Sequence, residues 1–198
     1  MAAATLSGAL RDPCVPRLRL LPPEVADLLV SMQAPPRLGA HLRAVHDVAW
    51  ELTGWLAAAY PGLVFDRAAV LFGAATHDIG KVWHPRELSG PGSRHESAGQ
   101  RLLLAAGVAP RLARFAASHG VWDAPGLGVE DLLVAVADKV WKAKRVPDLE
   151  QLVVERLVAV SGREPWSVFL TLDDQLDVLA AGADARLAYQ NGFPVAVG

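Results

Sequence analysis

The sequence predicts an all-α protein built as a single helical bundle. Apolar residues recur at intervals of three and four along most of the chain, which is the spacing of one helix face. Proline, aspartate or serine stands where several of these segments begin, and glycine or proline where they end. With 198 residues, 52% hydrophobic and 20% charged, the chain has enough apolar material for one core.

The first elements follow from proline positions and apolar spacing. Residues 1–22 carry three prolines and scattered arginines, and we expect them to be irregular. A short helix is expected from Pro23, which suits a first turn, to the residue before Pro35. The next helix is expected over Arg37–Tyr60, and a proline–glycine pair ends it.

Six further helices complete the expected fold. Asp66 can cap the first of them, and Ser93 with Glu96 forms a capping-box pattern at the start of the second. The valine-rich run 132–136 could be a strand by local composition, but its flanks and length favour a helix. The expected ranges are 66–80, 93–107, 110–119, 129–146, 148–160 and 165–190.

The last of these helices is amphipathic, with an apolar face that could serve either the core or a homodimer interface. That face carries Trp166, Phe169, Leu172, Leu176 and Leu179.

Composition excludes several classes of function. A net charge of -2 and a pI near 6.3 argue against a general binder of nucleic acids or anionic membranes. No apolar run approaches the roughly 20 residues of a membrane-spanning helix. Cys14 is the only cysteine, so neither a disulfide framework nor a multi-thiolate metal site is expected. The first ten residues lack a signal-peptide pattern, and we expect a cytoplasmic protein.

The dipeptide His77-Asp78, followed by a glycine and Lys81, is the strongest candidate for chemistry. An imidazole beside a carboxylate suits divalent transition metals, and the lysine could meet a phosphate oxygen. His41 supports a metal site, because it lies about 50° from the centre of the apolar stripe of its helix and so points inward. His46 lies about 90° away, at the boundary with solvent, and is the reserve candidate for the same role.

Three further residues could join this site. Asp138 lies in a largely apolar helical stretch, and a buried carboxylate needs a metal or an ion pair. Its alternatives are an ion pair with Lys142 or exposure beside Lys139. His95 is in the first turn of a helix after a glycine-rich loop, where an exposed position is the alternative. His119 is in the last turn of another helix, where it could instead complement the helix dipole.

Six oxygen and nitrogen ligands without cysteine suit one or two divalent transition ions such as Mn, Fe, Co or Ni. Two ions bridged by Asp78 could hold a hydroxide and clamp a phosphoryl group. Phosphoester hydrolysis follows as the expected chemistry. The side chains that could offset substrate charge are Lys81, Arg94, Lys139 and Lys142.

The order His41, His77-Asp78, His95, His119, Asp138 resembles the six-ligand H…HD…H…H…D pattern of the HD superfamily of helical metal-dependent phosphohydrolases. The resemblance covers about residues 37–145. The chain is then expected to divide into a proline-rich segment with a short helix over 1–36, an HD metal-binding core over 37–146, and C-terminal helices packed on the core over 147–198.

The resemblance also implies the roles of the ligands. The first metal would be held by His41, His77, Asp78 and Asp138, and His95 and His119 would complete a second, bridged by Asp78. Asp78 and Lys81 would be the catalytic residues.

The chain lacks the GYP motif and the paired histidines of the HD-GYP branch. Its short loop between Asp78 and His95 looks more like that of small stand-alone HD hydrolases of nucleotides. A small phosphorylated substrate, such as a nucleotide, is the expected partner. Two alternatives share the same ligands: an HD-type di-iron oxygenase, and a degenerate HD module that only binds nucleotides or regulates.

Overall fold

The computed structural model describes residues 4–195 and confirms an all-α, single-domain bundle. Residues 1–3 and 196–198, the outer ends of the predicted terminal segments, lie outside the described residues. Over 4–195 no strand occurs, and no helix there is long and apolar enough to cross a membrane. The helices are α1 (Leu6–Arg11), α2 (Pro23–Ser31), α3 (Pro36–Ala59), α4 (Arg67–Thr76), α5 (Arg94–Ala105), α6 (Pro110–Ala113), α7 (Phe115–Ser118), α8 (Val129–Val140), α9 (Pro147–Ser161), α10 (Pro165–Ala180) and α11 (Ala183–Asn191), with 3₁₀ turns η1 (Ile79–Val82) and η2 (Pro85–Leu88).

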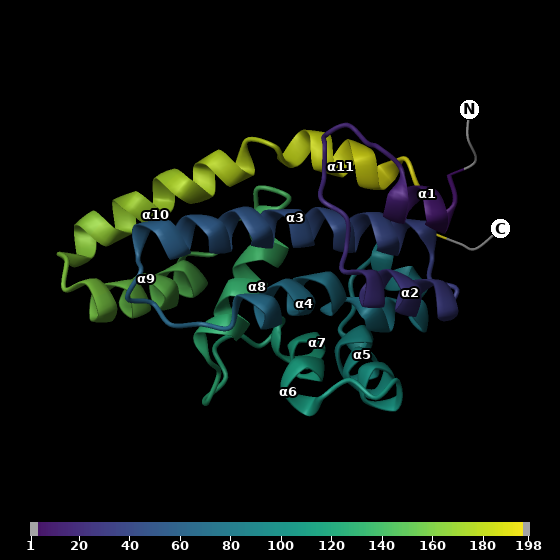
Figure 1. The fold of residues 1–198 in the computed structure, drawn as a ribbon, viewed down its shortest axis with the longest axis horizontal. Coiled ribbons are helices and arrows are strands. Elements are labelled where there is room, and N and C mark those ends of the chain that lie inside the picture. The colour runs from purple at the N-terminus through teal and green to yellow at the C-terminus, as the bar shows by residue number, and fades with distance from the viewer. Residues whose placement is uncertain (1–3, 196–198) are drawn as a thin grey trace.

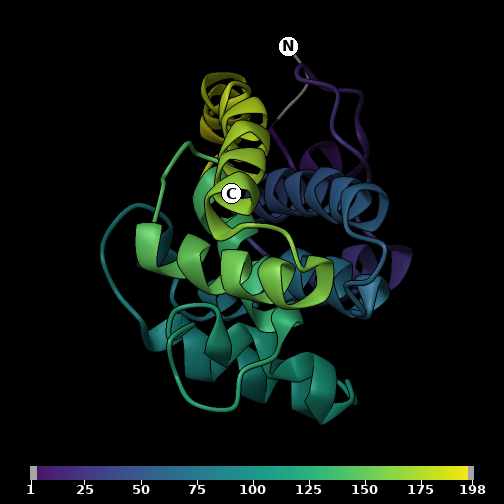
Figure 2. The ribbon, with the colours of Figure 1, turned by 90° about the vertical axis from the view of Figure 1, so that its left-hand side faces the viewer.

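The long helix α3 is the centre of the bundle (Figure 1). The C-terminal helices α10 and α11 run along one side of it, and α4 and α8 pack against the other. Beyond these lie α5, α6 and α7, which appear in teal at the bottom of the side view in Figure 2. Because α3 is covered on several sides, 15 of its 24 residues are buried.

The N-terminal segment is more ordered than the sequence predicts. Residues 6–11 form α1, and the Thr5 hydroxyl caps it by accepting a hydrogen bond from the backbone N–H of Gly8 at 3.1 Å. The buried guanidinium of Arg43 then holds the segment to α3, donating to the carbonyl oxygens of Asp12 at 2.9 Å and Leu18 at 3.0 Å. Long-range hydrogen bonds of this kind leave no periodic pattern in the sequence.

Two predicted helices are broken. The expected helix 110–119 is divided at Arg114 into α6 and α7. The expected helix 165–190 is divided after α10, where the Arg186 guanidinium donates to the carbonyl oxygens of Leu179 at 2.5 Å and Trp141 at 2.7 Å. A Cβ at Gly182 would lie 2.6 Å from Nη1 of Arg186, so the glycine leaves the space that this guanidinium fills.

Other boundaries also differ. α8 ends at Val140 rather than 146, because the chain turns there through Ala143, whose φ is +58°. α4 ends at Thr76, and the chain passes through a turn at His77 and Asp78 into η1. Ser93 precedes α5 but makes no side-chain cap, so the predicted capping box is wrong.

The amphipathic face predicted over 165–190 serves the core in part. Leu172, Leu176 and Leu179 of α10 are buried against the bundle. Trp166 and Phe169 remain exposed, at 66% and 45%. The homodimer therefore stays a prediction, and these two aromatic side chains are the part of the face left for it.

Candidate metal centre

Six buried histidine and aspartate side chains converge at the middle of the bundle, each delivered by the end or the face of a helical element. His41 comes from α3, Asp138 from the last turn of α8, and His95 from the first turn of α5. His77 ends α4, Asp78 opens η1, and His119 ends α7. None of the six is more than 7% exposed.

Asp78 is the point on which the cluster converges. Its Oδ2 lies 3.0 Å from His41 Nε2 and 3.6 Å from His77 Nε2. Its Oδ1 lies 2.9 Å from His95 Nε2 and 3.6 Å from His119 Nε2. The two oxygens of one carboxylate therefore face two different pairs of imidazoles.

The ligand atoms form two groups that share Asp78, and within each group all of them lie within 4.8 Å of one another. The first group is His41, His77, Asp78 and Asp138, and the second is Asp78, His95 and His119. His77 Nε2 lies 3.3 Å from Asp138 Oδ1, which ties α4 to α8 in the first group. Donors at this spacing can surround an ion in each group.

Each imidazole is held through Nδ1, which leaves Nε2 directed at the cluster. His41 Nδ1 lies 3.1 Å from Oε1 of Gln190 in α11, and His95 Nδ1 lies 2.6 Å from Oε2 of Glu87 in η2. His77 and His119 use backbone carbonyl oxygens of their own helices, at 3.0 Å and 3.3 Å. Metal-ligating histidines are oriented by such contacts, because a proton fixed on one ring nitrogen leaves a lone pair on the other.

The arrangement fits a bound cation. With Nδ1 protonated on His41 and His77, their Nε2 lone pairs face each other at 3.3 Å. Asp78 Oδ1 and His95 Nε2 are buried without a hydrogen-bond partner. Buried acceptors that face one another without a donor are unfavourable, and a metal ion between them would remove that cost.

The charge states also suit metal binding. Burial lowers the pKa of His41, and it lowers the pKa of His119 to about 4, so both rings are neutral near pH 7. Burial alone would raise the pKa of the Asp78 carboxyl, but the imidazoles of His77, His41 and His95 around it hold this pKa well below its usual range. Neutral imidazoles and ionised carboxylates are the forms that coordinate metals.

The pKa of His95 is shifted the other way. Burial would lower this pKa, but contacts with Asp78 and Glu87 outweigh it and raise the pKa. His95 therefore binds a proton more readily than His41 and His119 do when no metal is bound.

Two lysines stand at the edge of the cluster. Lys81 Nζ contacts Oδ2 of Asp78, and Lys139 Nζ lies 2.5 Å from Oδ2 of Asp138. Their side chains are 15% and 19% exposed, so both lysines are more open to solvent than the carboxylates that they contact. Arg94 and Lys142 are exposed, and Lys142 Nζ lies 5.9 Å from the centre of the Trp141 ring. The substrate-binding roles of all four remain predictions.

His46 does not lie where the helix phase predicts. It is 4% exposed rather than at the solvent boundary, and burial lowers its pKa to about 4. The phase calculation assumes that a helix has one buried face, whereas α3 is covered on several sides. His46 belongs to neither ligand group and lines a small, mainly apolar cavity with Trp50 and Phe72, so it is not the first ligand.

Glu87 and Gln190 were not identified from the sequence. Glu87 lies in the loop region after the His-Asp motif, where nothing in its spacing marks it. Gln190 lies 149 residues after its partner His41, beyond the span of the resemblance. Only the folded chain brings these two side chains into contact with Nδ1 of His41 and His95.

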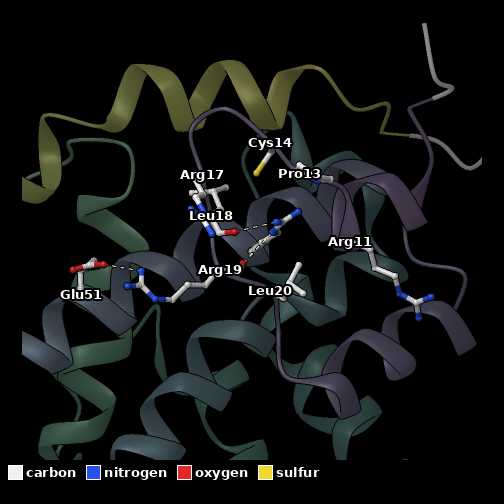
Figure 3. Close-up of a pocket in the computed structure, with 9 residues that line it drawn as sticks. Arg11, Pro13, Cys14, Arg17, Leu18, Arg19, Leu20 and Glu51 are labelled. Carbon is white, nitrogen blue, oxygen red and sulfur yellow. Dashed lines mark hydrogen bonds and ion pairs between the residues drawn. The ribbon is translucent and has the colours of Figure 1, made fainter.

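A large surface cavity of about 870 Å³ lies apart from the cluster, between residues 11–20 and α3 (Figure 3). None of its lining residues belongs to either group of candidate ligands. Arg19 pairs with Glu51 at 2.6 Å (Figure 3). Arg43 donates to backbone carbonyl oxygens. These arginines attach the N-terminal segment to α3, and Arg11 points away from them.

Comparison with known proteins adds no relative: no family model, curated protein or solved structure matches the chain.

Proposed function

We propose that this protein is a metal-dependent phosphohydrolase that acts on a nucleotide or another small phosphoester. One observation carries the proposal: two groups of buried candidate ligands share the carboxylate of Asp78. A lysine also contacts each of the two aspartates, Lys81 at Asp78 and Lys139 at Asp138. The order of these ligands along the chain is the one that resembles the HD superfamily. Divalent ions bound there would supply Lewis acidity and a water of lowered pKa.

The two lysines give the site its preference for a phosphoester. Lys81 and Lys139 are the partly exposed cations closest to the ligand carboxylates. When metal ions neutralise Asp78 and Asp138, the ammonium groups become available to a phosphoryl oxygen. A fixed cation beside the reacting group stabilises the charge that develops there during hydrolysis.

The test uses metal-free protein reconstituted separately with Mn²⁺, Co²⁺, Ni²⁺ or Fe²⁺. Phosphate release is measured on a panel of nucleotides and simple phosphoesters, and oxygen uptake is followed in parallel with Fe²⁺. We expect phosphate release with at least one metal. Release with none would refute the proposal, and iron-dependent oxygen uptake without phosphate release would favour an oxygenase instead.

Asp78→Ala is the matching variant. It removes the ligand shared by both groups, so bound metal and phosphate release should be lost together. His84→Ala is a suitable control, because His84 is close in sequence but belongs to neither ligand group. Full activity in Asp78→Ala would show that the cluster is not the active site.

A further inference from the structure

The two halves of the metal centre are unequal. The half formed by His41, His77 and Asp138 adds a carboxylate of its own to the shared Asp78. The half formed by His95 and His119 has only the shared carboxylate. An ion there meets one fewer protein ligand and one fewer full negative charge, and should bind more weakly.

The His95–His119 half differs from the other half in the group that accepts the hydrogen bond from one of its histidines. Oε2 of Glu87 accepts from His95 Nδ1 at 2.6 Å and also from the His95 backbone N–H at 3.1 Å. The other three candidate imidazoles donate to neutral oxygens, two backbone carbonyls and the amide of Gln190. A carboxylate acceptor makes a stronger hydrogen bond than a neutral one and makes the far nitrogen a better ligand.

The loop that runs from Glu87 to Gly92 holds the carboxylate of Glu87 in place. Glu87 lies in η2, and its side chain is only 10% exposed. A Cβ at Gly92 would lie 2.5 Å from Cδ of Glu87, so the loop returns against the carboxyl group with no room for a side chain. Glu87 thus fixes both the ring of His95 and the first turn of α5 that carries it.

We propose that Glu87 is a positioning residue that enables the His95–His119 half to hold the second, weaker of two metal ions. This inference rests on the proposed metal centre. Glu87 contacts no ion itself: it acts by fixing the proton on His95 Nδ1 and by supplying the negative charge that this half lacks.

The test is a titration of metal-free protein with Co²⁺, followed by calorimetry and by metal analysis after dialysis. We expect the wild type to bind two ions with separate dissociation constants. Glu87→Ala should raise the weaker dissociation constant about 10- to 100-fold and change the tighter one by less than about threefold. Glu87→Gln, which keeps an acceptor oxygen without the charge, should fall between.

Three further variants separate this role from damage to the fold. Gly92→Ala pushes on Glu87 without changing its chemistry and should also raise the weaker constant. Gln190→Ala removes the support of His41 and should raise the tighter constant instead. Glu155→Gln makes the same substitution on the exposed face of α9 and should change neither. Thermal unfolding of each metal-free variant reports whether the fold persists.

The outcomes distinguish this inference from the proposed function. A wild type that binds no ion would overturn both. A wild type that binds two ions, with both constants unchanged in Glu87→Ala or both raised equally, would overturn the role of Glu87 alone. A wild type that binds a single ion would also overturn it, because there would be no second ion to support.

Discussion

Replacement of Gly80 by alanine tests the structure most directly. Gly80 lies in η1, two residues after Asp78, and η1 packs closely on α5. A Cβ at this position would lie 2.5 Å from the backbone nitrogen of Gly99 and closer still to the carbonyl oxygen of His95. Both atoms belong to the backbone, so no side-chain rotation can relieve the clash.

The size of the effect follows from the displacement required. Real Cβ atoms essentially never approach other atoms within 3.0 Å, so α5 would have to retreat by roughly 0.5 Å at Gly99 and by more at His95. We expect a loss of about 3 kcal/mol, the upper part of the range for overpacking. This corresponds to a fall in melting temperature of roughly 6–12 °C for a chain of this size. Because His95 moves with α5, kcat/KM should fall about 100-fold.

Urea unfolding, metal analysis and phosphate release on Gly80→Ala provide the assay. Gly90→Ala is the matched control, because its Cβ would lie an ordinary 3.5 Å from the nearest atom, the carbonyl oxygen of Arg86. That variant should stay within about 0.5 kcal/mol of the wild type. If Gly80→Ala has the same free energy of unfolding as the wild type and keeps its metal, η1 does not pack on α5 as closely as described.

Three other predictions concern the histidines and Lys81. His41→Ala should lose bound Mn²⁺ on dialysis while His46→Ala keeps it, since His46 belongs to neither ligand group. Loss of Mn²⁺ from His46→Ala but not from His41→Ala would make His46 the ligand in place of His41. Between its folded pKa of about 4 and its ordinary value of 6.5, His46 stays neutral while the unfolded chain binds a proton, so stability should rise with pH across this window. The gain should reach about 3 kcal/mol, and urea unfolding of metal-free His46→Gln at pH 4, 5.5 and 7 should show a flatter dependence; an unchanged slope would contradict the burial of His46. Lys81→Ala should keep its metal but lose about 100-fold in kcat/KM for phosphate release; metal loss in this variant would show that Lys81 mainly supports Asp78.

Local patterns singled out residues that the structure brings together. His41 lies near the apolar face of its helix, and Asp138 is a charge in an apolar stretch; the structure places both in one ligand group. The same reasoning failed for His46, because a periodicity argument cannot see how many neighbours surround a helix. It also missed the break after α10, which depends on a guanidinium contacting a residue 45 positions away.

The amino-acid sequence by itself determined the all-α class, most of the helices and the chemical types of the candidate ligands, since these depend on residues close together in the chain. The tertiary structure alone decided which nitrogen of each imidazole faces Asp78 and which side chains support the candidate ligands. Those properties depend on acceptors such as Gln190, and on the approach of η1 to α5. Such contacts form only when distant segments pack, and helical periodicity carries no information about them.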